Sequence, residues 1–418
     1  MRVYVEALGC RLNAAEAESL ARGFAGAGCA VVASPEAADV IVINSCAVTA
    51  TAARKSRRRL RALHRLSPNA QLAAVGCWAT AAVAEAQSLP GVRWVIANPD
   101  KGRAVEIITG DVAALAAWVP GRWGHTRAFL GVQDGCDHHC TYCITRVLRG
   151  AAHSRPLTEA VAAVQHLVAH GAQEVVLTGV SLGAYGHDLG LADGLARLVQ
   201  AILADTEIAR LRLSSVEPWD VDAQLLRFLD HPRFCRQLHL PLQSGSDAVL
   251  KRMGRRGTTA QFAQLVADAR AISLDVAITT DLIAGFPGET ARDFQETLDF
   301  VERMAFARLH VFPYSEREGT PATRLPNSVP HPVRAERAAH LRALGRHLAV
   351  AYRTRFVGQT LPVLWESRDA HQVWRGLTDN YLAVRTRTAQ DLYNRLLPTR
   401  MTISTREGLL GEVVASMA

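Results

Sequence analysis

Three of the eight cysteines lie close together in one short segment, Cys136-Asp-His-His-Cys140-Thr-Tyr-Cys143. Eight cysteines scattered at random through 418 residues would produce a C-x3-C-x2-C pattern only about 0.003 times. Three thiolates at this spacing can bind three irons of a 4Fe–4S cluster and leave the fourth iron open to a substrate or cofactor. A zinc ion that borrows His138 or His139, or a purely structural cluster, would use the same cysteines. The spacing predicts a metal centre and leaves these alternatives open.

A second set of three cysteines, Cys10, Cys46 and Cys77, shares one position relative to the predicted strands. Each cysteine lies two residues after the end of a strand, and the three strands are expected at Arg2–Leu8, Asp39–Asn44 and Gln71–Val75. The carboxyl ends of parallel strands meet at one edge of a sheet, which is where open α/β sheets build their sites. We therefore expect a second cluster site there, the alternative being three buried thiols. Cys29 and Cys235 are expected to be such structural cysteines.

The first 122 residues alternate strand and helix patterns, which predicts a Rossmann-like parallel sheet with crossover helices. Helices are expected at Ala14–Ala27, with Asn13 as N-cap, and at Thr49–Leu66. In the second of these helices, seven of the twelve residues 54–65 are basic. A charged run of this kind is either a solvated face or a surface that follows phosphates.

Residues 123–352 repeat the alternation with a period that predicts a whole or partial βα barrel. The triple-cysteine loop follows the first expected strand, Phe129–Gln133, and so lies at the end where such barrels carry their active sites. Glycine-rich or polar segments follow the later strands, which suits close approach of the backbone to a ligand, although turns also need glycine. The later strands are expected at Glu174–Thr178, Leu211–Ser214, Gln237–Leu240, Asp275–Leu282 and Arg308–Phe312.

Residues 355–418 change to short strands punctuated by glycines, which predicts a small β-barrel. A basic helix, Val333–Tyr352, precedes them, and strands are expected at Leu361–Trp365, Tyr381–Arg385 and Met401–Thr405. This barrel is expected either to bind RNA or only to stabilise the chain.

The composition narrows the class of protein. Apolar residues make up 49% and charged residues 21%, which excludes a largely disordered chain. The net charge of +8 modestly favours a polyanionic partner. No lysine follows a glycine, so the usual phosphate-binding loop of P-loop NTPases is absent. Without a secretory signal or an apolar run long enough for a bilayer, the chain is expected in the cytoplasm and away from membranes.

Taken together, these features resemble the radical S-adenosylmethionine methylthiotransferases, whose terminal barrel is of the TRAM type. The likeness covers nearly the whole chain. It extends to four segments around the cysteines: Leu8–Asn13, Asn44–Cys46, Val75–Cys77 and Val132–Cys136. Two further segments, Leu238–Ser246 and Leu309–Ser315, resemble the branch that acts on N6-threonylcarbamoyladenosine in tRNA. Arg146 and Gly257 depart from the family pattern, which tends to have a proline and an aromatic residue there.

The resemblance implies two 4Fe–4S clusters and S-adenosylmethionine as cofactors. The cluster on Cys136, Cys140 and Cys143 would cleave S-adenosylmethionine to a radical that takes the hydrogen from C2 of the base. The cluster on the other three cysteines would carry a sulfur, methylated by a second S-adenosylmethionine and then delivered to C2. Five residues are implied as cofactor contacts: Tyr142, Gly179, Ser215, Glu217 and Gln243.

The implied partner is the anticodon loop of a tRNA, which exposes its nucleotides without unpairing a duplex. A reductant protein and a sulfur donor are implied but not identified. A carboxylate-bearing substrate needs a cation, and the expected candidates are Arg146, Arg149, Arg255 and Arg256. The alternatives are the branch that acts on isopentenyladenosine in tRNA, the branch that modifies an aspartate of a ribosomal protein, and an iron–sulfur protein that binds RNA without catalysis.

Overall fold

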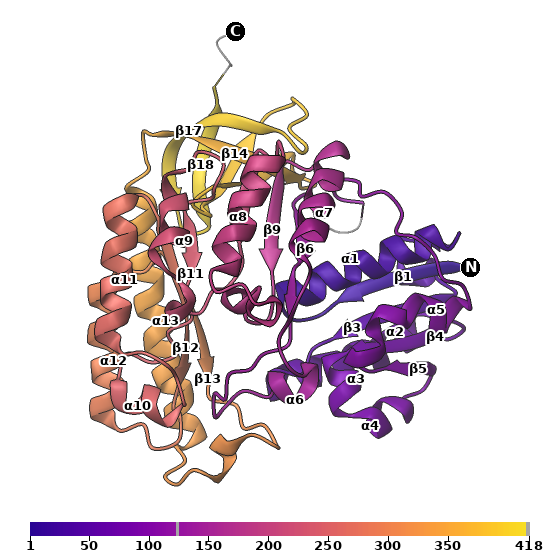
Figure 1. Ribbon diagram of the computed structural model, residues 1–418, viewed down its shortest axis with the longest axis horizontal. Coiled ribbons are helices and arrows are strands. Elements are labelled where there is room, and N and C mark those ends of the chain that lie inside the picture. Colours follow the sequence, from indigo (N-terminus) through magenta and orange to yellow (C-terminus); the bar gives the residue numbers. More distant parts are fainter. Residues whose placement is uncertain (123–124, 415–418) are drawn as a thin grey trace.

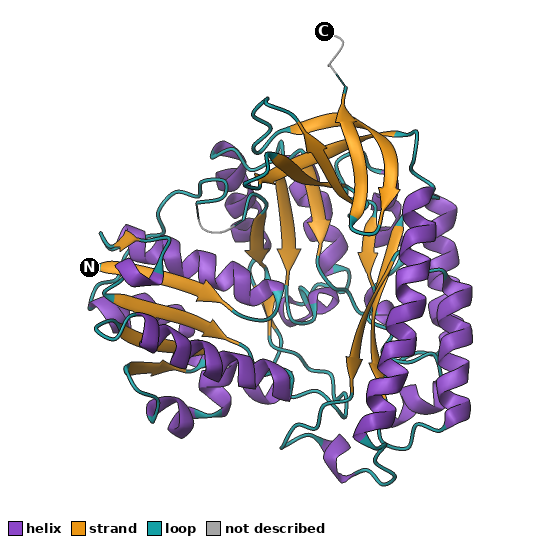
Figure 2. Ribbon diagram, turned by 180° about the vertical axis from the view of Figure 1, so that it is seen from behind, coloured by secondary structure: helices purple, strands orange, loops and turns teal. Residues whose placement is uncertain are grey.

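The computed structural model describes residues 1–122 and 125–414. Three parts follow one another along the chain: a parallel sheet, an open barrel of strands and helices, and a small closed barrel (Figures 1 and 2). This confirms the predicted fold class. The division at residues 122, 352 and 355 stays a prediction, and its boundary at residue 123 lies outside the described residues.

The N-terminal part is a parallel sheet with the strand order β2-β1-β3-β4-β5. Both faces of the central strand β3 are covered, because Ile41 and Ile43 join one apolar cluster while Val40 and Val42 join another. The strands are β1 (Arg2–Ala7), β2 (Ala30–Val31), β3 (Val40–Ser45), β4 (Gln71–Gly76) and β5 (Val92–Ile96). The helices are α1 (Arg11–Gly26), α2 (Ala50–Leu66), α3 (Cys77–Ala81), α4 (Val83–Gln87) and α5 (Ala104–Thr109).

Helix α1 begins earlier than the sequence predicts. Its N-cap is Cys10, and the helix starts at Arg11, so the expectation that Asn13 caps it is wrong. The Asn13 side chain instead donates to Leu8 O at 2.7 Å and to Ser45 O at 3.0 Å. Its amide therefore joins two turns that carry cysteines, and the helix gains three residues at its start. Helix α2, expected from Thr49, starts at Ala50, and Thr49 is its N-cap, with its hydroxyl accepting from Ala52 N.

The central part holds six main strands in two parallel sheets, β10-β9-β6 and β11-β12-β13. Single bridges, such as Ser215 with His239, join the sheets into a partial barrel. The strands are β6 (Ala128–Gly131), β7 (Gln133–Asp134), β8 (His153–Ser154), β9 (Glu174–Thr178), β10 (Arg210–Leu213), β11 (Gln237–His239), β12 (Ala277–Ala284) and β13 (Arg308–Pro313). The helices are α6 (Thr145–Arg149), α7 (Leu157–Ala169), α8 (Gly194–Asp205), α9 (Ala223–Arg227), α10 (Asp247–Arg252), α11 (Thr259–Ile272) and α12 (Ala291–Met304).

The two faces of this curved sheet differ in chemistry. Alternate residues of each strand pack under the helices in the largest apolar cluster, for example Leu211 and Leu213 of β10. The intervening residues, such as Arg210 and Arg212, face the inside, where they pair with Glu174 of β9. The inside of the barrel is therefore polar and charged.

Helix α13 (His331–Thr354) leads into a closed barrel of five strands in the order β14-β15-β16-β18-β17. The strands are β14 (Thr360–Arg368), β15 (Val373–Thr378), β16 (Ala383–Arg387), β17 (Leu396–Thr405) and β18 (Gly408–Val413). The barrel sits at the amino ends of β9 and β10, where Arg210 Nη1 donates to Leu377 O at 3.1 Å (Figure 1). Tyr381, predicted to begin a strand, lies in the turn before β16 with φ +65°. Within the described residues, none of the helices is both long and apolar enough to cross a bilayer.

Candidate active site

The C-x3-C-x2-C loop lies between β7 and α6 at the carboxyl end of the open barrel. Backbone hydrogen bonds fix its path, from Cys136 N to Gly150 O and from Cys143 N to Cys140 O, both at 3.1 Å. Gly135 enters the loop with φ +70°, and an added Cβ would meet a backbone oxygen at 1.8 Å. Only glycine permits this close approach.

The three thiols of this loop are half-buried and interact with one another. Burial raises the pKa of Cys136 to about 11 and raises that of Cys140, and each thiolate would raise the pKa of its neighbours further. His138 N donates to Cys136 Sγ at 3.4 Å and offsets part of this rise in the pKa of Cys136. Thr145 N donates to Cys143 Sγ at 3.4 Å. Ligands with these pKa values must release protons when a metal binds.

The donor set fits a cluster better than a single ion. In the described part of the chain, no group of three His, Cys, Asp or Glu side chains is arranged so that it could hold one metal ion. Each cysteine of a 4Fe–4S cluster binds a different iron, so such a cluster does not require the three thiols to meet at one point. The two histidines have other partners: His138 packs edge-on against Trp219 at 5.3 Å, and His139 contacts the guanidinium of Arg146.

Gly179 follows β9 at the same end of the barrel and lies against Gln133. An added Cβ at Gly179 would come 2.8 Å from Gln133 Oε1. Gln133 ties this turn to the cysteine loop, because its Oε1 accepts from Ser181 N and its Nε2 donates to Gly135 O, both at 2.8 Å. Gln133 was expected only as part of the Val132–Cys136 segment. Its contact with Ser181, 48 residues away, could not be predicted from the neighbouring residues.

Glu217 and Ser215 follow β10, the next strand along the sheet. Ser215 is half-buried beside His239. Burial raises the pKa of the Glu217 carboxyl even though Arg255 pairs with it at 2.8 Å. Arg255 also lies over the Trp219 ring at 4.4 Å, so this carboxylate is held in one place near Cys140.

Gln243 and Tyr142 complete the predicted contacts. Gln243 has φ +73°, a conformation that costs a residue other than glycine on the order of 1–3 kcal/mol and is typical of functional sites. Its backbone is locked to β12, with N donating to Asp281 O and O accepting from Ile283 N, both at 2.9 Å. The Tyr142 ring packs on an apolar cluster with Phe286. All five predicted contacts thus lie in the cysteine loop or after strands β9 to β11, at one end of the barrel.

The second cysteine set also comes together, at the carboxyl edge of the N-terminal sheet. Cys10 caps α1, Cys46 follows β3 and Cys77 begins α3. Gly9 has φ +104°, and an added Cβ would stand 2.6 Å from Cys46 Sγ. Glycine is therefore required for the first two turns to approach.

Hydrogen bonds join the three turns of this second set. Asn13 links the first two turns, as described above, and Ser45 links the second to the third because its hydroxyl donates to Val75 O at 2.5 Å. Burial raises the pKa of Cys46 to about 11, and the neighbouring Cys10 and Cys77 raise it further. The edge brings three thiols together, a donor set suited to iron and sulfur.

Arg149 connects the two cysteine sets. It ends α6, six residues after Cys143, and its side chain is 2% exposed. Its guanidinium donates to Glu16 Oε1, Asp134 Oδ1 and Asn13 Oδ1, each at 2.8 Å. One buried cation therefore fixes the barrel loop against the helix that follows Cys10.

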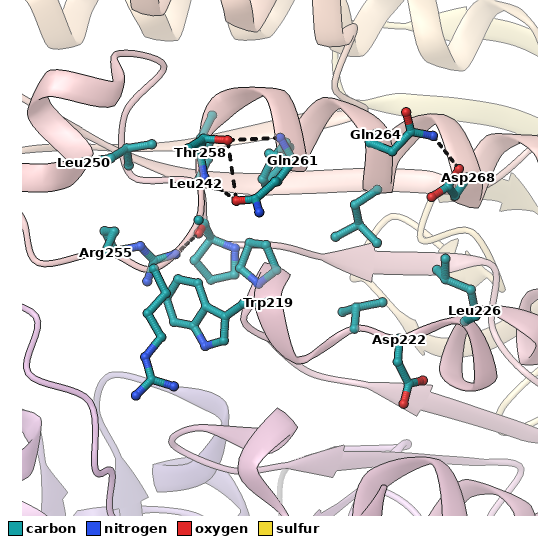
Figure 3. A pocket seen from close by; sticks show the side chains of 18 of the residues that line it. Trp219, Asp222, Leu226, Leu242, Leu250, Arg255, Thr258, Gln261, Gln264 and Asp268 are labelled. Carbon is teal, nitrogen blue, oxygen red and sulfur yellow. Dashed lines mark hydrogen bonds between the residues drawn. The ribbon is translucent and has the colours of Figure 1, made fainter. Parts of the chain in front are cut away.

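The two departures from the family pattern lie at the edge of this site. Arg146 is exposed beside His139. Gly257, with φ +83°, lines a pocket of about 780 Å³ that also includes Trp219 and Arg255 (Figure 3). The pocket lies between α9 and α11, and apolar side chains such as Leu226 and Leu242 form much of its wall.

The basic run predicted for residues 54–65 lies on α2, which starts four residues after Cys46. Two of its arginines form ion pairs, Arg57 with Glu85 at 2.5 Å and Arg59 with Glu6 at 2.7 Å. Four exposed arginines of the same helix make no ion pair with any described residue: Arg54, Arg58, Arg61 and Arg65.

Comparisons with known proteins agree with this architecture. Residues 130–301 match the radical SAM superfamily, and residues 2–97 match the uncharacterized protein family UPF0004. Among solved structures, the radical S-adenosylmethionine methyltransferase TsrM from Kitasatospora setae aligns with a TM-score of 0.51 at 15% identity, over 81% of this chain and 69% of that chain. At that identity the likeness concerns the fold alone.

Relatives of known name align over nearly the whole chain. The threonylcarbamoyladenosine tRNA methylthiotransferase MtaB of Thermotoga maritima is 38% identical over 91% of this chain and 90% of its own. The protein of the same name from Bacillus subtilis is 34% identical over 94% and 92%. A tRNA-2-methylthio-N(6)-dimethylallyladenosine synthase from Chloroflexus aurantiacus is 33% identical over 98% and 91%. The chain therefore belongs to the MtaB-type family of radical S-adenosylmethionine methylthiotransferases.

Proposed function

We propose that this enzyme attaches a methylthio group to C2 of N6-threonylcarbamoyladenosine in the anticodon loop of tRNA. The observation that carries the proposal is the pair of three-thiol sets, held on facing edges of two domains and joined by Arg149. The near-full-length relatives named for this reaction support the choice of substrate.

The two sets divide the work between them. We assign one 4Fe–4S cluster to Cys136, Cys140 and Cys143 and a second to Cys10, Cys46 and Cys77. The bound clusters and S-adenosylmethionine supply reductive cleavage of the cofactor at the first set and a methylated sulfur at the second. A radical is needed because the C2–H bond of an aromatic base is unactivated. A separate site is needed to hold the methylthio group until that radical has formed.

The protein's own side chains hold the cofactor in place. Gly179 leaves room for Gln133, which sets the path of the turn after β9 where the cofactor would lie, and Tyr142 supplies an apolar wall. Glu217, fixed by Arg255, offers a carboxylate to hydroxyl or ammonium groups, and Ser215 and Gln243 add hydrogen-bonding groups after β10 and β11. These roles support orientation of the cofactor and exclusion of water.

The exposed face of α2 and the terminal barrel are proposed to bind tRNA through its phosphates. Changing Arg54, Arg58 and Arg61 together to Glu is expected to weaken tRNA binding and to lower the slope of log K against log salt by roughly 2 to 3, since fewer counterions are released. The matched control is Arg103→Glu, on an exposed side chain of the same domain. Unchanged affinity and slope in the triple variant would make α2 a solvated face.

The direct test of the substrate is mass analysis of tRNA nucleosides from a strain that lacks the protein. We expect threonylcarbamoyladenosine to lose its 2-methylthio group and the isopentenyl nucleoside to keep its own. The second candidate function is methylthiolation of isopentenyladenosine, which the relatives named as dimethylallyladenosine synthases support. It predicts that the isopentenyl nucleoside loses its 2-methylthio group instead. A ribosomal protein that loses mass, with both nucleosides unchanged, would instead support modification of a protein aspartate.

The remaining requirements are proposed by class. Because it acts on tRNA, we propose that the enzyme works in the cytoplasm, with a reductant protein to deliver electrons and a sulfur donor to reload the second cluster after turnover. Both can be sought by reconstituting the reaction with purified components.

A further inference from the structure

The proposed substrate carries a threonine carboxylate, and the arginines expected from the sequence to receive it are poorly suited. Arg149 is fully engaged by Glu16 and Asp134. Arg255 is held by Glu217, the Pro241 carbonyl and the Trp219 ring. Neither guanidinium is free to bind a new anion, and the other two candidates, Arg146 and Arg256, are exposed at the surface. A half-buried cation is available beside the second cysteine set.

Arg11 lies where such a cation is needed. It is the first residue of α1, directly after Cys10. Helix α1 packs along the inside of the open barrel, where Ala15 joins Phe129 of β6 and Val176 of β9 in one apolar cluster. The start of this helix therefore points its side chain at the inner, polar face of the barrel, beside the second cysteine set.

The position of Arg11 is fixed by Tyr381 from the terminal barrel. Arg11 Nη2 donates to Tyr381 Oη at 3.3 Å, and its guanidinium lies 5.4 Å from the centre of the ring. Two more guanidinium groups face the same ring, Arg212 at 4.8 Å and Arg127 at 5.5 Å. Tyr381 lies at the junction of three domains and has φ +65°. This backbone conformation is unfavourable for a residue other than glycine and is typical of functional sites.

The other guanidinium groups around this ring have carboxylate partners. Arg127 pairs with Glu366 at 2.6 Å and, like Arg210 and Arg212, with the buried Glu174. Arg11 has no carboxylate partner in any ion pair of the described residues; its hydrogen bond is to the phenol. It is half-buried, so part of its side chain remains accessible to solvent.

Polar side chains of β12 and β13 lie near Arg11 on the inner face. Burial lowers the pKa of His310 to about 4, the charge of Arg11 lowers it further, and the His310 side chain is 39% exposed. It stands with Asp281, which pairs with His239 at 3.2 Å. A polar group entering along this face from the anticodon loop would meet Arg11 as a cation without a carboxylate of its own.

We propose that Arg11 binds the carboxylate of the threonylcarbamoyl group and that Tyr381 is a positioning residue that holds the guanidinium for this contact. The inference rests on the proposed function and names the group that selects its substrate. Because Arg11 adjoins Cys10, the contact would place the base beside the sulfur-carrying set. A neutral isopentenyl group has no charge or hydrogen-bond acceptor to pair with this guanidinium. Its binding would remove water from the cation without replacing it by a partner, which costs free energy.

The test compares stem-loop RNAs that carry threonylcarbamoyladenosine, its neutral threonine methyl ester, or isopentenyladenosine. For the wild-type enzyme we expect kcat/KM to fall roughly 10- to 100-fold from the acid to the ester, the range for a hydrogen bond to a charged group. Arg11→Gln is expected to lose the same factor on the acid and to change by less than about threefold on the ester. Arg11→Lys should restore part of the preference.

Tyr381→Phe is expected to lower kcat/KM on the acid RNA alone, mainly through KM. The matched control is Tyr352→Phe, since Tyr352 Oη accepts from Asn380 beside the same turn without reaching the N-terminal domain. All variants are compared at equal iron content and equal 5′-deoxyadenosine formation. This comparison separates substrate recognition from damage to the neighbouring cluster.

Two results would overturn the inference while the proposed function stands. One is an Arg11→Gln enzyme that retains wild-type kcat/KM on the acid RNA, and the other is an equal loss on the acid and the ester. A wild-type enzyme that ignores the threonylcarbamoyl RNA and modifies the isopentenyl RNA would overturn the inference and the proposed function together.

Discussion

Replacing Arg149 with methionine tests the junction that joins the two cysteine sets. The side chain is 2% exposed and contacts Glu16 and Asp134, each at 2.8 Å. Removing one partner of a buried ion pair costs about 3–5 kcal/mol, because the remaining charge is left without compensation. Lys101 lies 2.5 Å from Glu16 and 3.8 Å from Asp134, so it keeps part of the compensation. We therefore expect the lower end, about 3 kcal/mol.

A loss of this size corresponds to a fall in Tm of roughly 6–12 °C for a unit of 150–250 residues. The assay is thermal unfolding of the cluster-loaded enzyme, followed by circular dichroism, with Arg103→Met as the control. Arg103 is 65% exposed in its pair with Glu106, and its replacement is expected to change stability by less than about 0.5 kcal/mol. If the two variants unfold at the same temperature, Arg149 is not the connection we describe.

The other predictions concern iron content and pH. Anaerobic reconstitution is expected to give about eight irons per chain, and about four after Cys136, Cys140 and Cys143 are replaced with Ala. If the variant kept eight irons, this loop would not be a ligand set. One tightly bound zinc per chain in the untreated protein would favour the zinc alternative. Burial raises the pKa of Glu18, which is 4% exposed near Trp118, to about 8. Because this folded-state pKa exceeds the unfolded value, Glu18 favours folding fully at low pH, and that contribution is lost as pH rises toward and through 8. Above pH 8, Glu18→Gln is therefore expected to raise the free energy of unfolding by on the order of 3–5 kcal/mol, and so to raise Tm. The Tm of the variant should also depend less on pH than that of the wild type. The same dependence of Tm on pH in both proteins would contradict the raised pKa of Glu18.

Much of the fold follows from local patterns in the sequence. The strand Glu174–Thr178 and the C-terminal end of helix α2 at Leu66 lie where the patterns predict them. Strands β15 and β18 of the terminal barrel are missed, because their pairing with β14 and β17 depends on closure of the whole barrel. Short strands of this kind have little pattern of their own.

The candidate site shows the same division. The cysteines and the loops after the strands are predictable because their place depends only on strand ends, which the alternating pattern marks. The partners of the arginines are not predictable, because Arg149 reaches Glu16 across 133 residues and Arg11 reaches Tyr381 across 370. Tertiary packing decides which of the many arginines are neutralised. Arg149 and Arg255, two of the four arginines expected to bind a substrate carboxylate, are neutralised in this way, and we propose Arg11 in their place.

The most direct test of the whole account separates cofactor cleavage from sulfur transfer. Replacing Cys10, Cys46 and Cys77 together with Ala removes the second set and leaves the barrel loop intact. With reductant and S-adenosylmethionine, this variant is expected to form 5′-deoxyadenosine and to give no methylthiolated RNA. Methylthio product at the wild-type rate would contradict the assignment of sulfur transfer to this set, and loss of 5′-deoxyadenosine formation would contradict the independence of the two sites.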